Sequence, residues 1–151
     1  MYKKLTLIAL ASSFFVGCAA VPYEQLKLDT TTNFRVPSPE KSGIYVYQWK
    51  SGIYAAIRDV DFEIKGQPKI SLNTGEYGYF EVSPGEYEYK WTGGIFGKQY
   101  FPIKFEAGQN YFFHAYLMDF TDRANLIKEQ EKIDEAKKNI LSGRYELYNV
   151  D

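Results

Sequence analysis

Apolar side chains alternate with polar ones along most of the chain from Gly43 onward, which predicts a succession of β-strands. The first strand, residues 43–49, is apolar on both faces, as expected at the centre of a sheet. The second, residues 59–65, alternates apolar with charged side chains, so we expect one face in the core and the other in water. Further strands are expected over residues 69–72, 77–82, 86–91, 100–105 and 110–117.

Turn signals separate these strands about every 8 to 12 residues. Gly66-Gln67 predicts a two-residue hairpin of type II′, with the glycine at the first central position. Asn73–Gly75 and Ser83-Pro84-Gly85 predict two more turns, the second with proline followed by glycine as in type II. Short strands at this spacing favour a mainly β fold: an antiparallel, immunoglobulin-like sandwich of about seven strands.

The period changes near Thr121, where the sequence predicts one C-terminal amphipathic helix over residues 121–143. Thr121 or Asp122 could cap its start, and Gly143 could end it in the left-handed conformation. Residues 145–150 then predict an edge strand. The apolar stripe of the helix comprises Leu126, Ile127, Ile133, Ala136, Ile140 and Leu141.

The N-terminus has the pattern of a targeting segment. Two lysines, Lys3 and Lys4, precede an apolar run from Leu5 to Val16. This run is shorter than the 20 or so residues that span a bilayer, and it matches a signal-peptide core of roughly 7 to 15 residues. We therefore expect residues 1–17 to be a signal peptide.

The end of that run, Phe15-Val16-Gly17-Cys18, resembles the lipobox of bacterial lipoproteins. The resemblance implies cleavage between Gly17 and Cys18, with lipid attached to the cysteine, so that the membrane is bound through Cys18. Several acyl chains anchor firmly where one chain is marginal. By the same resemblance, Ala19 after the cysteine favours the outer membrane over the inner one, with the domain facing the periplasm.

Residues 18–40 follow as a lipidated N-terminus and tether, since they contain three prolines and a threonine run without a sustained period. Extended, about twenty such residues reach on the order of 70 Å. Residues 41–151 form the expected β-sandwich domain with its C-terminal helix.

Composition supports this picture. Aromatic residues make up 18% of the chain, with 14 Tyr and 11 Phe, which favours strands. The net charge is −1, and loss of Lys3 and Lys4 leaves 16 basic against 19 acidic residues, or −3. Such a domain lacks the basic surface that nucleic acid requires, so nucleic acid is excluded as a partner. With Cys18 lipidated, no internal disulfide can form.

Three stretches carry a family resemblance: "SGIYVYQW", "VSPGEYEYKW" and "EAGQNYFFHA". From Lys41 to about Leu147 the chain resembles a family of bacterial lipoproteins of unknown function with a PEGA-like β-sandwich. The resemblance implies a periplasmic or surface lipoprotein and no particular reaction.

Candidate catalytic chemistry is sparse. His114 is the only histidine, which excludes a histidine-rich metal site, and it is expected to pack in its aromatic strand. Asp59, Asp61 and Glu63 alternate along one strand, so that each lies about 6.6 to 7 Å from the next, a spacing compatible with inverting glycoside hydrolysis. They are expected on a solvated face, where a raised pKa is absent. We expect no enzyme activity, no catalytic residues, no metal and no cofactor.

Two features are candidates for binding. The glycine-rich loop at residues 92–98 carries Ile95 and Phe96, which could contact a partner or pack on the domain. Two aromatic rows could stack on sugar rings if exposed, or form core if buried, and we expect at least one to be buried. The rows are Tyr45, Tyr47 and Trp49, and Tyr87, Tyr89 and Trp91.

The leading hypothesis is a lipid-anchored, non-enzymatic interaction or assembly module of the cell envelope, with an envelope protein as its partner. One alternative is a glycan-binding or peptidoglycan-binding module that uses an aromatic row. Two others are a secretion-machine lipoprotein with a transthyretin-like sandwich and a hydrolase built on the three acids.

Overall fold

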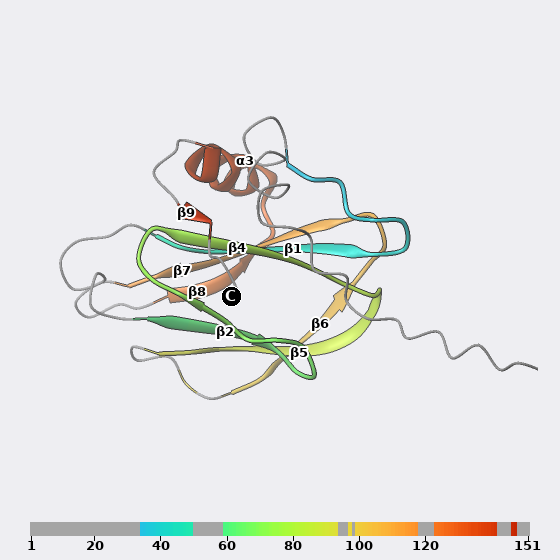
Figure 1. Cartoon of the computed structure of the whole chain (residues 1–151), viewed down its shortest axis with the longest axis horizontal. Helices are drawn as coiled ribbons and strands as arrows, with labels where there is room; N and C mark the ends of the chain where they lie inside the picture. The colour runs from blue at the N-terminus through green and yellow to red at the C-terminus, as the bar shows by residue number, and fades with distance from the viewer. Residues whose placement is uncertain are drawn as a thin grey trace, which may run out of the picture.

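The computed structural model describes residues 34–49, 59–93, 97, 99–117, 123–141 and 146–147. Within them the chain forms a two-layered β-sandwich with one helix near its C-terminus (Figure 1). The prediction of a mainly β sandwich with a C-terminal helix is confirmed. The elements are β1 (Ser42–Gln48), β2 (Val60–Ile64), β3 (Ile70–Leu72), β4 (Glu76–Val82), β5 (Gly85–Thr92), β6 (Phe101–Phe105), β7 (Asn110–Tyr116), β8 (Arg123–Ile127), α3 (Gln130–Asn139) and β9 (Glu146–Leu147).

One sheet has the order β8-β7-β1-β4-β9 and the other β3-β2-β5-β6. The five-stranded sheet is mixed, because β1 is parallel to β7 and β4 is parallel to β9, so the purely antiparallel arrangement was wrong. The nine described strands also exceed the seven or so expected. The additional strands are the short β9, at the sheet edge as predicted, and β8, which the sequence analysis had assigned to the helix.

β1 lies at the centre of the five-stranded sheet, as predicted, and all seven of its residues are buried. Because side chains alternate across a strand, it supplies two cores at once. Ile44 and Val46 face the core between the sheets, while Tyr45 and Tyr47 face the opposite side. The core between the sheets also contains Val60, Phe62, Ile64, Leu72, Val82, Trp91, Phe105 and Phe113.

The second core lies on the outer face of the five-stranded sheet, beneath α3 (Figure 1). Ala136 of α3 and Ile140, which caps the end of the helix, pack there on aromatic rings. The Tyr45 and Phe112 rings stack at 5.1 Å with an interplanar angle of 8°. This sandwich therefore buries aromatic side chains on both faces of one sheet, which accounts for the high aromatic content.

The helix prediction was partly wrong. Residues 123–127 of the predicted helix form β8, which pairs with β7 in antiparallel register. Ala124 and Leu126, two residues apart, both face the core between the sheets, as alternate residues of a strand do. A short apolar run fits the period of a strand and that of a helix, and here the pairing with β7 determines which one forms. Glu129 takes the cap position without a side-chain cap hydrogen bond. The predicted caps Thr121, Asp122 and Gly143 lie outside the described residues.

Of the three turns predicted around a glycine, the first two are closed by backbone hydrogen bonds, and their outcomes differ. The Gln67 N–H donates to the Ile64 carbonyl at 2.9 Å, so Gly66, with φ of 82°, is the second central residue and not the first. A type II turn requires positive φ at that position, so the type II′ prediction was wrong. The turn at Asn73–Gly75 is confirmed, since the Glu76 N–H donates to the Asn73 carbonyl at 3.1 Å.

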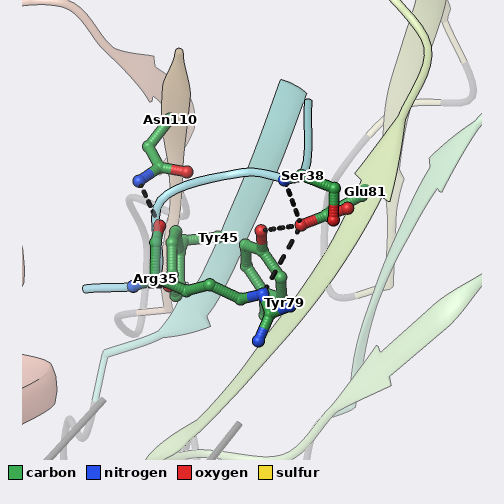
Figure 2. A network of polar contacts seen from close by, with 6 residues as sticks. All are labelled: Arg35, Ser38, Tyr45, Tyr79, Glu81 and Asn110. Atoms are coloured by element: carbon green, nitrogen blue, oxygen red, sulfur yellow. Dashed lines mark hydrogen bonds and ion pairs between the residues drawn. The ribbon is translucent and has the colours of Figure 1, made fainter. Parts of the chain in front are cut away.

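Residues 34–40, here called the strap, come from the segment expected to be tether and pack on the sheet (Figure 2). The Phe34 ring meets the Tyr45 ring edge-on at 5.1 Å. The Arg35 N–H donates to the Tyr45 hydroxyl at 3.1 Å, and the Asn110 amide donates to the Arg35 carbonyl at 2.8 Å. The packed domain thus includes seven residues before residue 41.

Glu81 fixes the other end of the strap (Figure 2). Its Oε1 accepts the Ser38 N–H at 3.0 Å and the Tyr79 hydroxyl at 2.8 Å, and lies 3.6 Å from the Arg35 Nε. Burial alone would raise the pKa of Glu81, but the hydrogen bonds from Ser38 and Tyr79 and the Arg35 charge hold it below its usual value. The carboxylate is therefore ionised and joins strap to sheet at neutral pH.

Candidate functional site

α3 covers only part of the outer face of the five-stranded sheet. Its apolar stripe, Ile133, Ala136 and Ile140, packs over the rings around Tyr45. Beside that contact, a groove of about 430 Å³ runs between the helix and the sheet. Its lining comprises Tyr47, Trp49, His114, Tyr116, Asn125, Leu126, Ile127, Glu129, Lys132, Glu135 and Asn139.

The floor of this aromatic groove comes from β1 and β7, which are parallel neighbours. Register places Tyr47 beside His114, and their rings stack at 4.5 Å with an interplanar angle of 14°. Trp49, directly after β1, meets His114 edge-on at 5.8 Å and Tyr116 edge-on at 6.3 Å. The result is a continuous aromatic surface on which Trp49 and Tyr116 are only half-buried.

The wall of the groove comes from α3 and is polar. Lys132, Glu135 and Asn139 recur at helical spacing, so they share one side of the helix next to its apolar stripe. Glu129 precedes the helix and lies 3.6 Å from the Lys132 ammonium. The groove therefore has an aromatic floor, a hydrogen-bonding wall and two carboxylates against one ammonium.

His114 lies in the floor in its neutral form. Burial lowers the pKa of His114 to about 4, because desolvation disfavours the imidazolium. Its Nε2 is buried and has no hydrogen-bond partner among the described residues. A base with so low a pKa is poorly matched to proton abstraction near neutral pH, which favours a packing role and agrees with the sequence expectation.

Asp61 and Glu63 lie on the other sheet, away from the groove, on the outer face of β2. Asp61 accepts hydrogen bonds from Ser71 and, at 2.9 Å, from Lys69. Burial alone would raise the pKa of Asp61, but these bonds outweigh it and lower the pKa. Hydrogen bonds from Tyr100 at 2.5 Å and then Lys90, 2.9 Å away, lower the pKa of Glu63.

A catalytic acid needs a raised pKa, and these two carboxylates have lowered ones. Asp59, the third acid, is exposed just before β2. The three residues thus lie on a solvated face, as expected, and two of them, Asp61 and Glu63, form ion pairs with lysines. Among the described residues, no group of three or more His, Cys, Asp or Glu side chains could hold a metal ion.

The expectation that at least one aromatic row is buried is confirmed. Tyr45 and Tyr47 are 1% and 2% exposed, beneath the strap and α3. Trp91 is 4% exposed, and Tyr87 and Tyr89 pack against the core between the sheets. Trp49, at the end of the first row, and Tyr87 in the second are half-buried and border two different surface grooves, so an extended exposed platform does not form.

The groove was not predicted from the sequence. Tyr47 and Trp49 are more than sixty residues from His114 and Tyr116, and only the parallel pairing of β1 with β7 joins them. No local pattern predicts that pairing. Gly17, Cys18, Ile95 and Phe96 lie outside the described residues. Across the part of the chain that is described, no helix is long and apolar enough to cross a membrane.

The fold and the groove define a small β-sandwich protein with one partly open aromatic face. The chain belongs to the family described as "Protein of unknown function (DUF2846)", whose model matches residues 38–125. That span includes the groove floor, the whole four-stranded sheet and strands β1, β4 and β7 of the other sheet, and it ends within β8, before α3. A search of curated proteins found no match. The predicted resemblance to a family of unknown function is confirmed, and the likeness to PEGA modules stays a prediction.

Proposed function

We propose that this protein is a lipid-anchored, non-enzymatic binding module of the bacterial outer membrane that faces the periplasm. In this proposal, lipid on Cys18 holds the chain to the membrane, and the aromatic groove contacts the ligand. The observation that carries the binding part is the groove itself: aromatic floor, polar wall and about 430 Å³ of space. Ligand sites typically combine an apolar surface of this kind with a few polar groups.

The strap supports the anchoring part. Because Phe34 is packed on the sheet, the stretch between lipid and domain is residues 18–33, sixteen residues in all. Extended, that stretch reaches about 50 Å. The domain can then stand well clear of the bilayer, with the groove accessible to periplasmic ligands.

The titration states support a non-enzymatic role. The pKa of His114 is lowered to about 4, and those of Asp61 and Glu63 are also lowered. None of these groups is poised near neutral pH, where general acid and base catalysis is most effective. Binding without turnover is the function that these groups favour.

Metabolic labelling tests the anchor. Cells that express the full chain are fed an alkyne fatty acid, and the tagged protein is followed by mass and by membrane separation. We expect labelled protein in the outer-membrane fraction, with an N-terminus at Cys18, and we expect Cys18→Ser to abolish both labelling and membrane association. Membrane association without label, or label retained by the serine variant, would contradict the proposal.

A further inference from the structure

We propose that the aromatic groove binds a pyranose ring of a neutral or N-acetylated envelope glycan. The inference deepens the proposed function by naming the ligand class, and its chemistry does not depend on the lipid. It rests on three properties of the groove: the shape of its floor, the hydrogen-bonding groups of its wall and its charge.

The floor suits the apolar face of a sugar ring. A pyranose presents C–H groups on its faces, and these carry a small positive charge that is attracted to the negative face of an aromatic ring. Trp49 and Tyr116 offer half-buried rings beside the groove, 6.3 Å apart between centroids. The Tyr47–His114 stack beneath them keeps this floor rigid and, because His114 is neutral, uncharged.

The wall suits the edge of the same ring. Sugar hydroxyls both donate and accept hydrogen bonds, and an N-acetyl group adds one donor and one acceptor. Asn125 on β8 and Asn139 on α3 carry amides that do the same, and Glu135 carries an acceptor. Asn125 lies on the sheet beside His114, and Glu135 and Asn139 lie on the helix that forms the wall. A ligand with one flat apolar face and a polar perimeter therefore matches both surfaces.

Charge selects among flat ligands. Nucleotides and phosphorylated sugars also combine a ring with polar groups, but they need cations. The groove lining contains two carboxylates, Glu129 and Glu135, against one ammonium, Lys132, and that ammonium lies 3.6 Å from Glu129. An anionic ligand would meet net repulsion here. Neutral and N-acetylated sugars do not.

The test titrates the full chain, in a detergent without a sugar headgroup, with soluble tetrasaccharides. The first probe is a β-1,4-linked tetramer of N-acetylglucosamine, and the second is a tetramer of glucose. The chain has two tryptophans, of which Trp91 is buried in the core and Trp49 borders the groove. We expect a saturable change in tryptophan fluorescence from Trp49, and the probe that binds more tightly identifies the type of sugar.

Two groove variants and one control locate the site, with binding measured by calorimetry. Trp49→Leu removes the open ring of the floor, and Asn125→Ala removes one amide from an exposed position where the fold is not at risk. Each is expected to raise the dissociation constant by roughly two- to tenfold, the size of one lost ring stack or hydrogen bond. The control is Phe101→Ala, which removes a 47% exposed ring from β6 in the other sheet and should leave binding unchanged.

Lack of saturation with both tetramers at millimolar concentration would overturn the ligand assignment, as would equal binding by the wild type and by both groove variants. So would tighter binding of a phosphorylated sugar than of its neutral counterpart. These results are separable from failure of the anchor, because a chain that is lipid-labelled yet binds neither tetramer keeps the proposed function and loses only the glycan.

Discussion

At the residue scale, the surroundings of His114 change the protonation of its imidazole. Stacked on Tyr47 and meeting Trp49 edge-on, it has lost the solvation that an imidazolium needs. The pKa of His114 therefore falls to about 4 from the usual 6.5. Because it is the only histidine, its ring resonances can be followed alone by NMR. We expect them to titrate near pH 4, and titration near 6.5 would show a solvated ring.

The same shift predicts acid sensitivity. The unfolded chain binds a proton at His114 between pH 6.5 and 4, and the folded chain does not, so stability falls as the pH drops through that window. At pH 4.5 the loss amounts to roughly 2 to 3 kcal/mol of unfolding free energy. In urea unfolding at pH 7 and pH 4.5, His114→Phe should lose less stability on acidification than the wild type by about that amount. An equal loss in both proteins would mean that other groups dominate.

At the scale of elements, the strap is the clearest addition to the expected domain. Phe34 is 8% exposed and packs against the rings of Tyr45 and Phe112, so Phe34→Ala removes buried aromatic surface and leaves a cavity. We expect a loss of about 2 to 4 kcal/mol in urea unfolding. Val36→Ala is the matched control, because Val36 lies in the same strap but is 78% exposed and should cost under about 0.5 kcal/mol. Equal effects of the two substitutions would show that the strap is not part of the folded domain.

The elements also show how far the sequence was informative. Strands were predictable where one face is apolar and a turn residue follows, as at β2, β4 and β6. β8 was not predictable in this way. Leu126 fits a helical stripe with Ile133 and Ile140, and it also fits a strand face with Ala124. Pairing with β7 decided the outcome, through contacts that are distant in sequence. The packing of the strap on the sheet was not predictable either, because Phe34 stands in a segment with prolines and threonines and without the apolar period of a strand or helix.

At the scale of the whole molecule, the groove forms because α3 does not cover the whole aromatic face of the sheet. The outer face of the five-stranded sheet is aromatic along β1 and β7, but α3 is only ten residues long and its apolar stripe covers part of that face. The sequence predicted that at least one of the two aromatic rows is buried. Which ring stays open depends on the parallel pairing of β1 with β7 and on where α3 begins, and local patterns predict neither.

The most direct test of the account is site-specific photo-crosslinking in living cells. A benzophenone amino acid is placed at Asn125 or Glu135, exposed positions beside the groove, and at Glu86 or Lys104, exposed positions on β5 and β6 of the opposite sheet. If the groove is the binding surface of an anchored module, adducts will form from Asn125 and Glu135 and not from the other two. Adducts from Glu86 or Lys104 alone, or none from any position at normal expression, would contradict it.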